Sequence, residues 1–177
     1  MKRALRALTA TITAVLLLSG CLGNNPSVAA TVGTSPYISE TQLTTMANAL
    51  AEFTGERNFS RSQTLYLLLI GKIASDASGN PTIGTYVNTA AIAQLKAAPD
   101  LAALVSNPKA ELFLDDLLAS QLLMEAANSD AAVVPAMQAA SMEQEVIVHP
   151  RYGSWNPQQL AFDGNGSLSR PASEVLR

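Results

Sequence analysis

The chain has 177 residues, with 11 lysines and arginines against 14 aspartates and glutamates, and it contains one cysteine. One cysteine excludes an intrachain disulfide framework, so packing must hold the fold together. The acidic balance argues against a nucleic-acid partner and against a polybasic membrane patch, because both need an excess of positive charge. The length suits one domain behind an N-terminal targeting segment.

Residues 1–20 have the charge order of a signal peptide. Lys2, Arg3 and Arg6 form a positive start, and an apolar stretch follows from Ala7 to Leu18. This stretch is far shorter than the roughly 20 apolar residues that a membrane-spanning helix needs. Removing the three basic residues from the 11 leaves 8 basic against 14 acidic side chains, a formal charge of −6 for the rest of the chain.

The segment Leu18-Ser19-Gly20-Cys21 follows and holds the only cysteine. It resembles the lipobox of bacterial lipoproteins, in which a diacylglycerol is attached to the cysteine and a peptidase cuts before it. The resemblance implies lipid attachment at Cys21, a lipobox of Leu18, Ser19 and Gly20, and a tether over residues 21–27. Acyl chains such as palmitate would then anchor the protein at the extracytoplasmic face of the cell membrane. The alternative is an ordinary signal peptide with an incidental cysteine.

The folded domain is expected over residues 28–163, and it begins with a strand. Small and β-branched residues from Val28 to Val32 favour that strand, and residues 33–36 then turn the chain. Ser39 and Gln42 form a capping box, which predicts a helix from Ser39 that Gly55 ends. Its apolar residues recur at helical spacing and place Leu43, Met46, Leu50 and Phe53 on one face.

Two further helices are predicted next. Ser60 and Gln63 form a second capping box, and Leu65–Ile73 is apolar on almost every side, so this helix should be central and buried. Gly79-Asn80-Pro81 is expected to stop it. Asn88 can cap a third helix that runs to about Lys96.

The second half of the domain reads as two helices and a strand. After a short helical turn at residues 100–105, Asn107-Pro108 is expected to open a fourth helix that ends near Asn128, with Asp115 and Asp116 on its solvent side. A fifth helix is expected from about Pro135 to Glu145. Residues 146–148 favour a strand, residues 149–157 read as irregular, and residues 164–177 are expected to be disordered.

This order of elements resembles the N-terminal domain of SurA-type periplasmic chaperones, in a short lipoprotein form without the parvulin domains. Three passages carry the resemblance, which covers roughly residues 28–157: Ala29–Phe53, Gln63–Ile73 and Val146–Pro157. It implies a mainly α fold of about five helices, closed by a two-stranded β element that pairs the N-terminal and C-terminal segments. It also implies a cleft for unfolded polypeptide. Only residues 129–134 separate the last two helices, so no isomerase domain fits there.

The sequence offers no catalytic constellation, and an enzyme, a cofactor or a metal site is not expected. His149, the only histidine, follows a strand without a cysteine nucleophile or an acid partner nearby in sequence, which favours a hydrogen-bonded loop residue. Residues 163–167 resemble the start of a calcium loop, but the later ligand pattern does not fit. Asp115 and Asp116 point in different directions on a helix, so they cannot share a site.

Two aromatic side chains in the C-terminal segment are the remaining candidates. Tyr152 and Trp155 either contact a bound peptide or clamp this segment to the helices, and the clamping interpretation is favoured. The first functional hypothesis is a lipid-anchored chaperone-like module that binds unfolded or exported polypeptide without isomerase activity. The second is a structural or adaptor lipoprotein that docks to a folded membrane or cell-envelope partner. The oligomeric state stays open.

Overall fold

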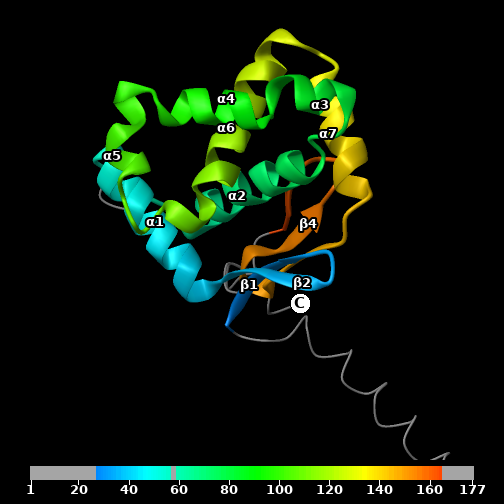
Figure 1. Ribbon diagram of the computed structural model, residues 1–177. Coiled ribbons are helices and arrows are strands. Elements are labelled where there is room, and N and C mark those ends of the chain that lie inside the picture. The colour runs from blue at the N-terminus through cyan, green and yellow to red at the C-terminus, as the bar shows by residue number, and fades with distance from the viewer. Residues whose placement is uncertain (1–26, 57–58, 165–177) are drawn as a thin grey trace, which may run out of the picture.

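The computed structural model describes residues 27–56 and 59–164, and this part of the chain is mainly α, as predicted (Figure 1). The expected signal peptide and lipobox, Cys21, residues 22–26 of the expected tether and residues 165–177 lie outside the described residues. The helices enclose one core, which draws on every part of the described chain from Ala29 to Trp155.

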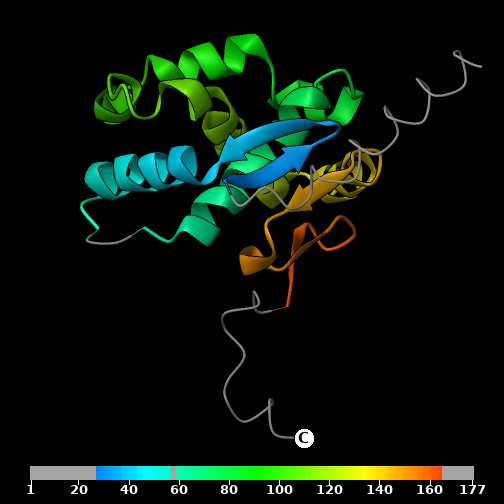
Figure 2. The ribbon, with the colours of Figure 1, turned by 90° about the horizontal axis from the view of Figure 1, so that it is seen from below.

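A small antiparallel sheet closes the domain at one end, seen from below in Figure 2. Strand β1 (Val28–Val32) pairs with β3 (Val146–Val148), so the predicted pairing of the N-terminal and C-terminal segments is confirmed. The sheet has a third strand, β2 (Ser35–Ser39), on the other side of β1. Residues 35 and 36 were expected in a turn, but Gly33 adopts a left-handed φ of 63° and turns the chain earlier.

Helix α1 (Glu40–Thr54) begins and ends where the sequence predicts. The Ser39 side chain accepts a hydrogen bond from the Gln42 backbone N–H at 3.2 Å, and the Gln42 side chain accepts one from the Ser39 N–H at 2.9 Å. The capping box is therefore complete. Gly55 ends the helix.

Helix α2 (Arg61–Asp76) runs through the middle of the molecule, as its apolar sequence predicts. It packs most closely against α6 (Leu114–Ser129), and Gly71 lies at their contact. A Cβ atom at this position would lie 1.6 Å from the backbone oxygen of Asp116, so only glycine fits. The predicted second capping box is wrong, because the Ser60 side chain makes no capping hydrogen bond.

The helices across the top of Figure 1 are shorter than the rest. Asn80 and Pro81 were expected only to stop α2, but they also start α3 (Pro81–Tyr86), because the Asn80 side chain accepts hydrogen bonds from the backbone N–H groups of Thr82 and Ile83. Asn88 caps α4 (Thr89–Lys96), as predicted. A 3₁₀ turn, η2 (Pro99–Leu101), and α5 (Ala102–Val105) follow.

The last two helices differ from their predicted bounds. Asn107-Pro108 does not start α6; the chain first makes turns and a 3₁₀ segment, η3 (Glu111–Phe113), and α6 begins at Leu114. The Asn107 side chain accepts a hydrogen bond from the Lys109 N–H, so this Asn-Pro signal forms a local turn. Helix α7 (Val133–Met142) begins and ends a few residues before the predicted range.

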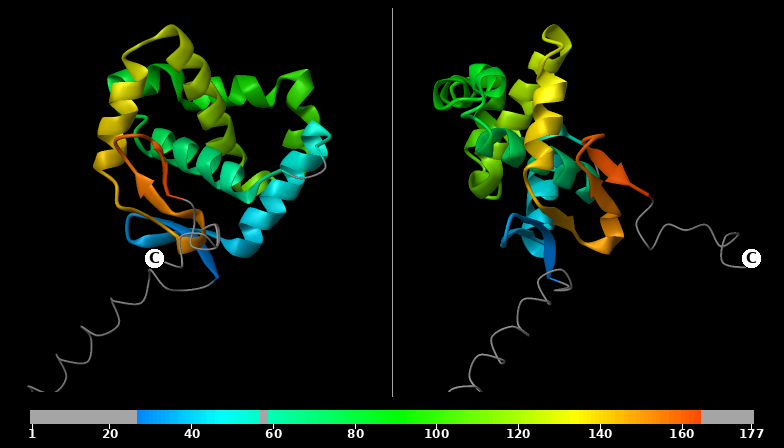
Figure 3. Two further views of the ribbon diagram at one scale, coloured as in Figure 1. Left: turned by 180° about the vertical axis from the view of Figure 1, so that it is seen from behind. Right: turned by 90° about the vertical axis from the view of Figure 1, so that its right-hand side faces the viewer.

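The segment after β3 is more regular than predicted. A 3₁₀ turn, η4 (Pro150–Tyr152), leads into a hairpin of β4 (Ser154–Asn156) and β5 (Ala161–Asp163) beside α2 and α7 (Figure 3). Gly153 joins η4 to β4 and has a φ of 91°, which favours glycine. A Cβ atom at this position would lie 2.5 Å from the Asp163 backbone oxygen, so a larger residue would also clash with β5. Trp155 and Phe162 face each other across the hairpin with ring centroids 5.6 Å apart. This pair gives the hairpin an apolar face that the sequence pattern did not reveal.

Candidate functional site

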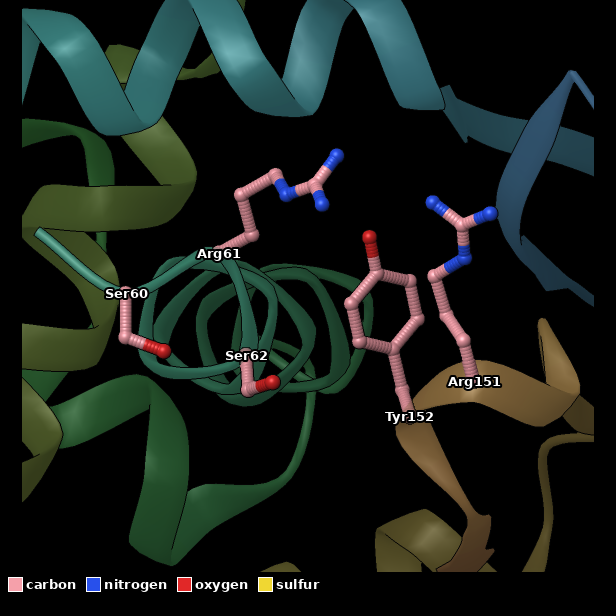
Figure 4. A pocket seen from close by; sticks show the side chains of 5 residues that line it. All are labelled: Ser60, Arg61, Ser62, Arg151 and Tyr152. Carbon is pink, nitrogen blue, oxygen red and sulfur yellow. The ribbon is translucent and has the colours of Figure 1, made fainter. Parts of the chain in front are cut away.

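A polar pocket of about 350 Å³ lies at the N-terminal end of α2 (Figure 4). The start of α2 contributes Ser60, Arg61 and Ser62, and η4 contributes Arg151 and Tyr152. In Figure 4 the Tyr152 hydroxyl lies between the two guanidinium groups. The pairing of β1 with β3 positions η4 there, since β3 leads directly into it.

The carboxylate of Glu40 holds these three side chains together. One oxygen, Oε2, accepts a hydrogen bond from the Tyr152 hydroxyl at 2.8 Å and lies 3.4 Å from Nη1 of Arg151 and 3.6 Å from Nη1 of Arg61. Two guanidinium groups share one carboxylate, so the cluster keeps a net positive charge. Glu40 is also the first residue of α1, where a negative charge is favoured by the helix dipole.

The Tyr152 hydroxyl is a donor at every physiological pH. Burial, followed by the hydrogen bond to the Glu40 carboxylate, raises the pKa of Tyr152 to about 12. The residue as a whole is 6% exposed, so its ring is covered while its hydroxyl reaches the carboxylate. Tyr152 therefore fixes η4 against α1.

The N-terminal end of α2 borders the pocket. Ser60 occupies the N-cap position, but its side chain accepts no hydrogen bond from the helix. The first N–H groups of an α-helix have no partner within the helix, and they attract negative charge together with the helix dipole. The arginines and this helix end make the pocket suited to an anion, not to a cation.

A second, apolar pocket of about 100 Å³ lies between α2, α6, α7 and the loop of the β4–β5 hairpin. Its lining comprises Tyr66, Ile70, Leu123, Met124, Ala127, Val133, Val134, Met137 and Leu160. The floor is buried, whereas Met124 and Val134 at the rim are each 42% exposed. Leu160 has a left-handed φ of 50°, which is uncommon outside glycine and costs on the order of 1 kcal/mol.

The two aromatic residues singled out from the sequence lie beside these pockets, and both are buried. Trp155 is 9% exposed and its indole N–H donates to the Ser141 hydroxyl at 2.9 Å, which fixes the hairpin to α7. Tyr66 of α2 lies 6.5 Å from the Trp155 ring. The geometry supports the clamping interpretation for Tyr152 and Trp155, since neither ring is open to a peptide.

Asp116 is not on the solvent side of its helix, contrary to the prediction. Its carboxylate accepts hydrogen bonds from the Tyr37 hydroxyl at 2.7 Å and from the Ser75 hydroxyl at 3.1 Å. Burial raises the pKa of Asp116, and these two hydrogen bonds oppose that rise in part. Burial and the neighbouring Asp116 charge raise the pKa of Tyr37 as well. With donors at both oxygens, Asp116 ties β2, α2 and α6 together and is a structural group.

The remaining candidates from the sequence have local roles or are not described. His149 accepts a hydrogen bond at Nδ1 from the Arg151 N–H at 3.3 Å, which is the loop role that was predicted. Asp163 accepts one from Asn156 within the hairpin. No group of three or more His, Cys, Asp or Glu side chains in residues 27–56 and 59–164 could hold a metal ion. Leu18, Ser19, Gly20 and Cys21 lie outside the described residues.

Within the part of the chain that the structure describes, no helix is both long and apolar enough to cross a membrane. Comparison with models of known protein families, with curated proteins and with solved structures found no match.

Sequence reasoning missed the arginine pair and its carboxylate. Arg61 and Glu40 were seen only as helix-start residues, and Arg151 as part of an irregular segment. More than a hundred positions of chain separate Glu40 from Arg151, so no local pattern could join them. The one available signal was the predicted pairing of β1 with β3, which brings the start of α1 near the residues after β3.

Proposed function

We propose that this protein is a lipid-anchored extracytoplasmic module that binds apolar segments of polypeptide in a chaperone-like manner, without isomerase activity. The apolar pocket between α2, α6 and α7 is the observation that carries the proposal. A groove between helices that is lined by leucine and methionine is what such a role requires. Methionine adapts its shape to different apolar partners, which suits a surface with more than one client.

Exposure at the rim supports a binding role for this pocket. Met124 and Val134 remain 42% exposed although they sit above a buried apolar floor. The left-handed backbone of Leu160 completes one wall at a conformational cost, and such costs gather at binding sites. The volume of about 100 Å³ takes one or two apolar side chains, so each client would be held at short segments.

The same small volume favours a second candidate. A structural or adaptor lipoprotein that docks to one folded partner of the membrane or cell envelope needs only one well-fitting apolar anchor. The two roles differ in selectivity: a chaperone-like module binds many unfolded chains, whereas an adaptor binds one folded surface.

The location is part of the proposal and rests on the lipobox-like segment that ends in Cys21. In a bacterial host the native protein should fractionate with membranes, and mass spectrometry should find acyl groups on a chain that begins at Cys21. A Cys21→Ser variant should leave the membrane fraction. A native chain without acyl groups would refute the anchor.

Aggregation suppression tests the binding role. The chain from residue 22 onward contains all described residues and is added to a chemically unfolded client. We expect the native chain to suppress light scattering, and Met124→Glu to suppress it several-fold less, because a charge at the rim penalises apolar binding. Leu112→Glu is the matched control, since Leu112 is 76% exposed and does not line the pocket.

No suppression at a large molar excess, or equal suppression by Met124→Glu and the native chain, would refute the chaperone-like role of this pocket. Crosslinking in native membranes then tests the adaptor role. A single folded partner whose crosslinks disappear in Met124→Glu would support it.

A further inference from the structure

The polar pocket at the start of α2 contains guanidinium N–H donors that have no partner among the described residues. Each guanidinium group carries five N–H donors in a planar fork. Among the described residues, the guanidinium groups of Arg61 and Arg151 each form an ion pair only with Glu40, through one Nη1 atom. The two side chains are 47% and 34% exposed, so a ligand can reach them from the pocket.

This pocket also lies near Ser27, the residue at which the tether joins the folded domain. The backbone N–H of Glu40, whose side chain holds the two arginines, donates to the backbone carbonyl of Ser27 at 2.8 Å. Six peptide steps join Ser27 to Cys21, and an extended chain spans at most about 3.6 Å per residue, or about 20 Å in all. With Cys21 in the membrane, this tether is short enough for the arginine pair to reach the headgroup layer.

We propose that the pocket formed by Arg61, Arg151 and the N-terminal end of α2 binds the phosphate of a phospholipid headgroup in the membrane that anchors Cys21. The proposal rests on the lipid anchor of the proposed function and adds a second contact to it. The guanidinium fork matches the spacing of phosphate oxygens. The helix end supplies backbone donors and a favourable dipole beside the arginines.

The charge of the rest of the domain makes this contact directional. Residues 21–177 carry a formal charge of −6, so most of the surface is repelled by anionic headgroups. The arginine pair is a local exception at the anchored end. Lipid at Cys21 and phosphate in the pocket together would hold the domain in one orientation, whereas a lipid alone leaves it free to rotate.

Arginine protection on a lipid surface tests the proposal. The chain from Cys21 to Arg177 contains the whole described fold and has a single thiol for coupling to a maleimide lipid. It is coupled to vesicles of phosphatidylglycerol or of digalactosyldiacylglycerol, which has no phosphate. The modification rates of Arg61 and Arg151 by phenylglyoxal are read by mass spectrometry. We expect both arginines to be modified at least about fivefold more slowly on phosphatidylglycerol vesicles than on galactolipid vesicles. This factor corresponds to the free energy of about 1 kcal/mol that one arginine gains near an anionic surface.

Two variants separate the pocket from general charge. In Arg61→Gln, the modification rate of Arg151 on phosphatidylglycerol should rise about fivefold, because the Arg61 guanidinium no longer helps to hold the phosphate. Lys109→Gln makes the same charge change at a surface pair with Glu52 and should leave the protection unchanged. Equal modification rates on the two kinds of vesicle, or equal losses in the two variants, would overturn the proposal.

Free inorganic phosphate and glycerol 3-phosphate, added to the galactolipid vesicles, distinguish the source of the anion. Protection by these solutes without protection by phosphatidylglycerol would overturn the lipid assignment. The coupling is chemical, so the vesicle result does not depend on lipidation in the cell. Absence of acyl groups on Cys21 from cells would instead count against the proposed anchor.

Discussion

The close contact between α2 and α6 at Gly71 allows a quantitative prediction. A Cβ atom at Gly71 would lie 1.6 Å from the Asp116 backbone oxygen and 2.4 Å from its carbonyl carbon. The obstacle is backbone, so the two helices must separate. Overpacking of a core costs about 1–3 kcal/mol, and a forced backbone shift lies at the upper end of that range. The higher helix propensity of alanine offsets up to about 1 kcal/mol of this loss of stability. Gly71→Ala should therefore reduce the free energy of unfolding by about 2 kcal/mol.

Urea unfolding followed by the fluorescence of Trp155, the only tryptophan, measures this change. Gly79→Ala is the matched control, because a Cβ atom at Gly79 meets nothing within 4 Å. We expect the control to be neutral or slightly stabilising. A Gly71→Ala chain as stable as the control would show that α2 and α6 can move apart at little cost, and it would refute the reasoning from this close backbone contact.

Two further predictions concern the buried polar groups. Burial raises the pKa of Asp116, so the folded state binds this proton more tightly than the unfolded state, whose pKa is near 3.8. The native chain should thus gain stability relative to Asp116→Asn as the pH falls from neutral towards 4; parallel pH profiles of the urea midpoint would contradict this. Tyr152→Phe removes the hydroxyl that donates to the Glu40 carboxylate. It should lower the free energy of unfolding by about 1.5 kcal/mol in the same assay, which is the lower end of the range for hydrogen bonds to charged groups. Tyr86→Phe is the control, because it removes a hydrogen bond from Tyr86 to Asp130, and it should lose less stability. An equal loss of stability in both variants would show that Tyr152 does not fix η4 in place.

Elements with local signals were predictable from the sequence. The capping box at Ser39 and the Asn88 cap depend on residues three positions apart, so α1 and α4 begin where expected. Strands β1 and β3 were also predictable, because each is a short run of apolar, largely β-branched residues. The Asn-Pro pairs show the limit of such signals. Asn80-Pro81 starts a helix and Asn107-Pro108 forms a turn, so the same pair of residues does not by itself decide between the two.

The candidate sites depended on contacts that are distant in sequence. Tyr152 and Trp155 could be singled out from the sequence because large aromatic side chains in a turn-rich segment need a partner. Their partners, Glu40 and Ser141, could not be deduced. Asp116 was misplaced because a charged residue in an amphipathic helix is assigned to water by default. The donors that satisfy it come from β2 and α2, which no helical pattern encodes.

The pairing of β1 with β3 has a consequence for the order of folding. Thr31 and Ile147 face each other in the sheet although nearly the whole described chain lies between them. During synthesis β1 emerges first, and one of its edges stays unpaired until the residues of β3 have followed. Contacts of such long sequence separation form slowly, and a bare strand edge attracts other chains in the meantime. A chain truncated before Val146 would keep that edge of β1 permanently, so pairing with the late strand β3 is what covers it.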